Sequence, residues 1–221
     1  GAKDLSNLKV YNCRDVTITT GEEAISDPST SMNFSSALFQ NHATVTLPIP
    51  AGGSNFTSAQ FLYNRGDIKI EAPVGSPAAL NLTSATFGGS SSGNKDVRIT
   101  VPSGDITLSP STWTNNQDVK ITARSSSPRT LYNLQMTGHK NIELDLSETL
   151  TLRRTTIDTN TAVGTVLGYV SLPGTKNLTL TGEEGSPTTN PSRIKGNFIF
   201  EGRDSLTIDN GSGIDATGKG Y

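Results

Sequence analysis

This sequence is poor in cysteine, aromatic residues and charge. Its 221 residues include one Cys and one Trp, 6% are aromatic and 17% are charged. A single cysteine excludes an internal disulfide framework and any metal site built from several thiolates. No apolar run approaches the roughly 20 residues that a membrane-spanning helix needs. The formal net charge of −2 gives no electrostatic reason to expect a nucleic acid or an anionic membrane as a partner.

Helical periodicity is nearly absent from the chain. Short runs that alternate apolar and polar residues are bounded by Gly, Pro, Ser and Asn, which is typical of strands and turns. Eight of these runs share an apolar–x–apolar core, usually preceded by Asp or Asn, and they begin at Val16, Val45, Ile68, Val97, Val119, Ile142, Leu178 and Leu206. Neighbouring runs lie 22 to 36 residues apart, which indicates an internal repeat with insertions.

A second series of apolar pairs supports the repeat. The two residues of each pair are five positions apart, and the pairs are Leu5/Val10, Phe34/Phe39, Phe56/Phe61, Leu82/Phe87, Leu108/Trp113, Leu131/Met136, Leu152/Ile157 and Ile194/Ile199. An odd spacing cannot place both residues on one face of a straight strand, so each pair indicates a corner followed by a new strand. We therefore expect about three short strands per coil, with Phe39, Phe61, Phe87 and Trp113 in one buried aromatic column.

These patterns predict an all-β fold, a single-stranded parallel β-helix (β-solenoid) of about eight coils of 22–29 residues with loop insertions. Residues 1–221 are expected to form one solenoid domain, a fragment of a longer extracellular protein. Val97, Val119 and Ile142 should stack as inward neighbours on consecutive parallel strands. A leucine-rich repeat, suggested by residues 5–13, and a two-sheet sandwich are the alternatives, but a sandwich gives no reason for the same offsets to recur.

Cys13, His42 and His139 are the residues that a search for catalytic or metal sites would find first. Each lies three residues after the second apolar residue of its pair, a position occupied elsewhere by Asn64, Ser90, Asn116, Asn160 and Gly202. We interpret this position as a corner at which polar side chains bond the backbone of neighbouring coils. His42 and His139 would lie roughly 19 Å apart. We therefore expect neither a shared metal nor a Cys–His catalytic pair, and no cofactor.

The first strand of each coil presents a row of polar residues outward. Lys69, Arg98 and Lys120 are expected to form a basic ladder that ends at Glu143, with Glu71 and Asp145 alongside. Carboxylates and cations in such a row can bond saccharide hydroxyls. The alternative is a solvated face whose ion pairs are each worth at most about 1 kcal/mol.

Three insertions interrupt the repeat, and insertions in solenoids often carry function. Two of them begin Thr-Gly-Glu-Glu, at residues 20–23 and 181–184. Both lack the spaced ligands of a calcium loop, so acidic solvated turns are expected. The third, after Ile157, contains the run TVLGYVSL and predicts an extra hairpin strand on the side of the solenoid.

The repeated strand led by Asp or Asn, together with the Asn-rich corner, resembles the secreted right-handed parallel β-helix proteins. These include bacterial surface adhesin-like proteins and the pectate-lyase-like carbohydrate enzymes. The segment IDATGKGY at residues 214–221 is similar to an element inside long bacterial extracellular repeat proteins. The resemblance implies an extracellular or cell-surface location, a polysaccharide or cell-surface partner, and end-to-end stacking with further repeats.

The resemblance leaves two functions open. The lyase-like enzymes carry an acidic cluster with an Arg or Lys on one outward face, and the nearest match here is Arg98, Lys120, Glu143 and Asp145. Hydrolases of this fold need several Asp on adjacent strands, whereas here only Asp145 lies on such a strand. We therefore favour a non-catalytic adhesin-like module over a polysaccharide lyase or glycoside hydrolase. Ice binding and a trimeric phage spike segment are further alternatives.

Overall fold

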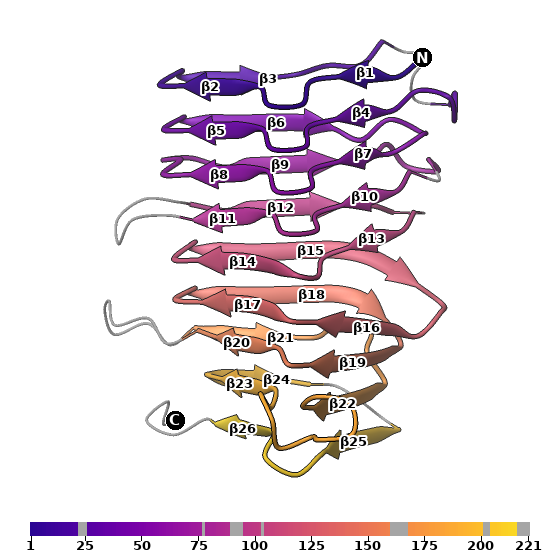
Figure 1. The fold of residues 1–221 in the computed structure, drawn as a ribbon, viewed down its shortest axis with the longest axis vertical. Coiled ribbons are helices and arrows are strands. Elements are labelled where there is room, and N and C mark those ends of the chain that lie inside the picture. The colour runs from indigo at the N-terminus through magenta and orange to yellow at the C-terminus, as the bar shows by residue number, and fades with distance from the viewer. Residues whose placement is uncertain are drawn as a thin grey trace.

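A computed structural model describes residues 1–21, 26–76, 78–88, 95–102, 104–159, 168–200 and 204–215. Within these ranges the regular secondary structure is entirely β, and the named strands pair in parallel. Successive coils lie one below another from the N-terminal to the C-terminal end (Figure 1). The predicted parallel β-solenoid is confirmed. The Thr-Gly-Glu-Glu turn at residues 20–23, the corner residues Ser90, Asn160 and Gly202, and most of IDATGKGY fall partly or wholly outside the described residues.

The strands form four sheets, which we call A to D. Sheet A contains β1 (Lys3–Asp4), β4 (Met32–Asn33), β7 (Ser54–Asn55), β10 (Leu80–Asn81) and β13 (Ile106–Thr107). Sheet B contains β2 (Lys9–Tyr11), β5 (Leu38–Gln40), β8 (Gln60–Leu62), β11 (Thr86–Gly88), β14 (Ser111–Thr114), β17 (Leu134–Thr137), β20 (Thr156–Asp158), β23 (Arg193–Lys195) and β26 (Gly213–Asp215).

The other two sheets complete the cross-section. Sheet C contains β3 (Asp15–Thr17), β6 (Thr44–Pro48), β9 (Ile68–Glu71), β12 (Val97–Thr100), β15 (Asp118–Ser125), β18 (Asn141–Ser147), β21 (Tyr169–Ser171) and β24 (Asn197–Ile199). Sheet D contains β16 (Arg129–Tyr132), β19 (Thr149–Arg153), β22 (Asn177–Thr181) and β25 (Ser205–Ile208). Sheet A is formed by strands of the first coils, and sheet D is formed by strands of the later coils.

The core follows from strand alternation. Val97 pairs with Val119, and Val119 pairs with Ile142, on consecutive parallel strands. All three side chains are buried, while Arg98 between Val97 and Ile99 points outward and is exposed. Each coil buries its apolar residues against the coils above and below as well as across its own interior, so the core depends on stacking. The predicted stacking of these three residues is confirmed.

Stacked aromatic rings run through the sheet B side of the core. Phe61 lies between Phe39 and Phe87, with ring centroids 5.1 and 4.6 Å away and interplanar angles of 8° and 5°. Trp113 continues the column 4.0 Å from Phe87. All four rings are fully buried. The column is the one that the repeat predicts, and Phe34 stacks on Phe56 beside it at 4.7 Å.

The assignment of strands after residue 157 differs from the sequence prediction. Leu178 pairs with Leu150 in sheet D and is not the next rung after Ile142. That rung is Val170 on β21, so the predicted side hairpin is a regular strand of sheet C. Leu206 follows Leu178 in sheet D. Every inward strand has the same apolar–x–apolar pattern, so the pattern alone does not say which sheet a run joins after an insertion.

The last apolar pair is also assigned to a different face. Ile194 pairs with Ile157 in sheet B, where the sequence places it beside Leu152. Its proposed partner Ile199 lies at the end of β24 in sheet C and is 44% exposed. The loop between β22 and β23 changes which residues of this coil form its strand in sheet B.

Candidate functional site

The five predicted binding residues lie on sheet C. Lys69, Arg98, Lys120 and Glu143 are in register on the consecutive strands β9, β12, β15 and β18. Asp145 is two residues beyond Glu143 on β18 and pairs in register with Thr122. The spacing of the repeat therefore placed these residues on one outward row and its neighbour.

A groove runs across the middle of this row. It has a volume of about 250 Å³ and is lined by Asp96, Arg98, Asp118, Lys120, Asn141, Glu143 and Tyr169. The groove contains three of the five predicted residues. Lys69 and Asp145 lie on the same sheet but do not line it.

Ion pairs organise the charged groups of the groove. The Lys120 ammonium lies 2.7 Å from Glu143 Oε1 on the next strand. Arg98 Nη2 lies 3.0 Å from Asp96 Oδ2, which precedes the same strand. The hydrogen bond from Arg98 to Asp96 and the charge of Asp96 raise the pKa of the guanidinium above its ordinary value. Lys120 and Arg98 keep about half of their side-chain area exposed, so both can exchange these partners for a ligand.

Four neutral or acidic residues of the groove were not predicted, namely Asp96, Asp118, Asn141 and Tyr169. Asn141 donates from Nδ2 to Asp118 Oδ1 at 2.7 Å, and its own Oδ1 accepts from the backbone N–H of Tyr169 at 3.2 Å. Asp118 and Asn141 are the polar residues that lead the repeated strand, so the motif itself could have indicated them. Tyr169 could not have been predicted, because the insertion that contains it indicates a side hairpin and not a strand of sheet C.

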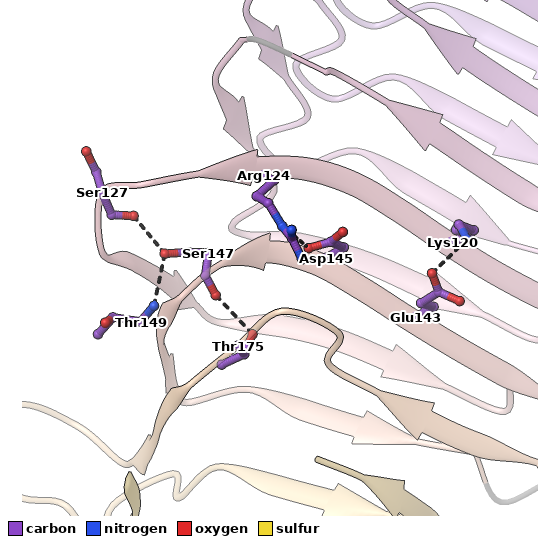
Figure 2. A network of polar contacts seen from close by, with 8 residues as sticks. All are labelled: Lys120, Arg124, Ser127, Glu143, Asp145, Ser147, Thr149 and Thr175. Carbon is purple, nitrogen blue, oxygen red and sulfur yellow. Dashed lines mark hydrogen bonds and ion pairs between the residues drawn. The ribbon is translucent and has the colours of Figure 1, made fainter. Parts of the chain in front are cut away.

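Asp145 belongs to a second cluster, at the end of sheet C. Its Oδ1 accepts from Arg124 Nε at 3.0 Å, beside the Lys120–Glu143 pair (Figure 2). Figure 2 also shows Ser147 at the corner that leads into sheet D. The Ser147 hydroxyl donates to the Ser127 carbonyl at 2.7 Å and accepts from the Thr149 N–H at 3.2 Å. These bonds fix the corner between adjacent coils.

The two histidines act as corner residues, as predicted. His139 is fully buried; its Nδ1 accepts from the Asn116 N–H at 3.1 Å and its Nε2 lies 3.2 Å from the Trp113 carbonyl. Because Nδ1 of His139 accepts and Nε2 faces a carbonyl, Nε2 carries the proton of the neutral ring. Asn116, at the equivalent corner, donates from Nδ2 to the Phe87 carbonyl at 3.3 Å. Burial lowers the pKa of His139 from 6.5 to about 4.

His42 repeats this arrangement one coil after Cys13. Its Nδ1 accepts from the Cys13 N–H at 3.1 Å, and its Nε2 lies 3.1 Å from the Val10 carbonyl. Both ring nitrogens of His42 therefore contact backbone groups. The Cys13 thiol is exposed and lies 3.5 Å from the Tyr11 carbonyl. This geometry supports a structural role for His42.

The second acidic turn is held by arginines. Glu184 Oε2 lies 2.9 Å from Arg153 Nη1, and Glu183 Oε1 lies 3.4 Å from Arg154 Nη1. The guanidinium of Arg154 also lies 5.4 Å from the ring centroid of Tyr132. The two carboxylates are exposed, as the prediction of an acidic solvated turn requires, and they also form ion pairs with arginines at the end of sheet D. In the described part of the chain, no group of three or more His, Cys, Asp or Glu residues could hold a metal ion.

Comparisons with known proteins add no relative. No family model, no curated protein and no solved structure matches the chain. Among the described residues, no helix has the length and apolar character needed to cross a membrane.

Proposed function

We propose that this chain is a non-catalytic, adhesin-like module of an extracellular or cell-surface protein, and that the outward face of sheet C binds a polysaccharide. The groove over β12, β15 and β18 is the observation that carries the proposal. It brings carboxylates, cations and amide groups together on a continuous parallel sheet. A polymer can lie along such a face and form hydrogen bonds on several successive coils.

The size of the groove favours one unit of a chain over an enclosed small molecule. Its volume of about 250 Å³ is below the 300–1,000 Å³ that is usual for small-ligand pockets. Lys120 and Arg98 offer donors, Glu143 and Asp118 offer acceptors, and Tyr169 lies at one edge with a ring that can contact a sugar face. Lys69 extends the same row one coil further.

The partners of the acidic groups support binding over catalysis. A glycosidase needs two carboxylic groups in separate roles, and one of them must be held protonated in a water-excluding site. Here Glu143 and Asp96 form ion pairs with cations, and Asp118 accepts from an amide. The side chains of Glu143 and Asp96 are 26% and 21% exposed, so solvent reaches both carboxylates, whereas an acid catalyst requires a water-excluding site.

Binding to immobilised polysaccharides tests the proposal. The panel contains neutral polymers and uronates, and biolayer interferometry measures the affinity of the chain for each. Lys120→Ala removes a donor of the groove and leaves Glu143 without its ion-pair partner. We therefore expect about a tenfold loss of affinity for the polymers that bind, or about 1.4 kcal/mol. Lys195→Ala removes the same charge from an exposed position on sheet B and should leave affinity unchanged. Equal losses in the two variants would contradict the proposal.

A further inference from the structure

The strand ladder is broken between β13 and β16. These strands belong to successive coils, but β13 ends sheet A and β16 begins sheet D, and the two do not pair. They lie apart on the right-hand side of Figure 1, whereas β10 lies next to β13 and β16 next to β19. A cleft of about 700 Å³ occupies this position, lined by residues 104–109, by Ser125 and by residues 127–132.

The backbone groups of β13 that lie outside the strand ladder can be assigned from its hydrogen bonds. The carbonyls of Asp105 and Thr107 accept from Leu80 and Leu82 of the preceding coil at 2.8 Å. Because successive residues of a parallel strand bond to opposite neighbours, the backbone groups of Ile106 and Leu108 point away from β10 and toward the cleft. The Leu108 carbonyl accepts from the Ser111 hydroxyl, so the groups that an added strand can use are the two N–H groups and the Ile106 carbonyl.

The same rule assigns the facing edge of β16. The N–H of Asn133, just after β16, donates to the Arg153 carbonyl of the next coil at 3.0 Å, so the groups of Thr130 and Tyr132 face back toward β13. The Tyr132 N–H donates to Ser109 Oγ at 2.9 Å, at the end where the two strands are held together.

Arg129 occupies the other end of the cleft in place of a ladder bond. Its Nη1 donates to the Ile106 carbonyl at 2.9 Å, and its Nη2 lies 2.7 Å from Asp105 Oδ1. The side chain is only 10% exposed, and its buried Nε has no hydrogen-bond partner. A buried cationic N–H without an acceptor is costly, so the guanidinium is poised to gain from an added acceptor.

We propose that this cleft is a docking site for an extended peptide segment of a partner protein, which adds as a strand to the β13 edge. Successive groups on one strand edge recur about every 6.6 Å, and a second strand has the same repeat. The added strand takes the Ile106 carbonyl from Arg129. Its inward side chain is aliphatic and contacts Ile106 and Leu131, which are buried at the cleft wall. An outward acidic side chain accepts from the released guanidinium.

The sequence of a native rung supplies the probe. Residues 176–182 (KNLTLTG) pair on both edges within sheet D, so a synthetic peptide with this sequence can form a strand. We expect it to bind the intact chain in a fluorescence anisotropy titration and to slow hydrogen exchange at the Ile106 and Leu108 amides. A version with Pro in place of Leu178 and Thr179 blocks both edges and should not bind.

A mutant cycle tests the role assigned to Arg129. Arg129→Ala frees the Ile106 carbonyl and should tighten binding of the native peptide about tenfold, because a charge-assisted hydrogen bond no longer competes. Asp105→Asn loosens the same guanidinium without altering β16 and should tighten binding to a smaller extent. A peptide with Thr179→Glu should bind the unmodified chain more tightly than the native peptide does, and this gain should vanish in Arg129→Ala. Arg193→Ala, on sheet B, is the matched control and should change nothing.

Four results would overturn the proposal. The first is equal affinity for the native and proline peptides, and the second is absence of binding by both. The third is protection of amides outside residues 104–109 and 129–132. The fourth is competition by an oligosaccharide, which would assign the cleft to a different ligand. None of these outcomes bears on the sheet C groove, because that site lies on a different sheet and has its own variants.

Discussion

Truncation of Phe61 to Ala removes the central ring of the aromatic column. The ring is fully buried and stacks on Phe39 and Phe87, and it also lies 6.0 Å from Phe56 at a tilt of 45°. A large-to-small change of a buried Phe costs about 3–5 kcal/mol. Each stacked pair adds about 0.5–1.5 kcal/mol beyond buried area, and two such pairs are lost here, so the upper half of that range is expected.

Urea unfolding followed by fluorescence provides the measurement. Trp113 is the single tryptophan and stacks 4.0 Å from Phe87, so its emission reports on the column directly. With a slope of about 3 kcal/mol per M, a loss of about 4 kcal/mol lowers the urea midpoint by about 1.3 M. Gln60→Ala, at the neighbouring exposed position of β8, is the control and should change the midpoint little. A loss below about 1 kcal/mol in Phe61→Ala would refute the stacked column.

Two further changes test the corners and the close contacts between coils. The unfolded chain takes up a proton near pH 6.5, whereas buried His139 does so only near pH 4, so the free energy of unfolding should fall by roughly 3 kcal/mol as the pH drops through this window. His139→Asn introduces the amide that Asn116 uses at the equivalent corner, and urea titrations from pH 4 to 7 should show that it lacks this part of the decline. Gly66→Ala should cost about 1–3 kcal/mol in the same assay, because a Cβ there collides with the Ala43 carbonyl of the preceding coil. Gly21→Ala, where a Cβ meets no atom within 4 Å, should be neutral, and similar losses at both glycines would contradict the stacking of coils.

The fold could be predicted because a solenoid repeats its physical constraints in the sequence. Val97, Val119 and Ile142 are inward residues on consecutive strands, and their spacing of 22 and 23 residues is the length of one coil. The prediction failed where insertions change that length. Val170 then took the place in sheet C that the sequence assigned to Leu178, because both lie in runs with the same alternation.

The candidate sites show a different limit. The row from Lys69 to Glu143 could be predicted, since residues at equivalent positions of a regular repeat lie in register. The cleft at Arg129 could not. Leu108 and Leu131 each have an apolar residue five positions further on, so the sequence suggests a continuous ladder there. Only the course of the backbone after β15 separates β13 from β16.

The most direct test of the proposed function measures binding and turnover on the same polysaccharide panel. Each polymer, uronates included, is incubated with the chain with and without calcium, and new reducing ends or unsaturated products are quantified beside the affinity. The account predicts saturable binding to at least one polymer, weakened by Lys120→Ala, with no product formed. Product formation that is abolished by Asp145→Ala would contradict it and identify a carbohydrate-active enzyme.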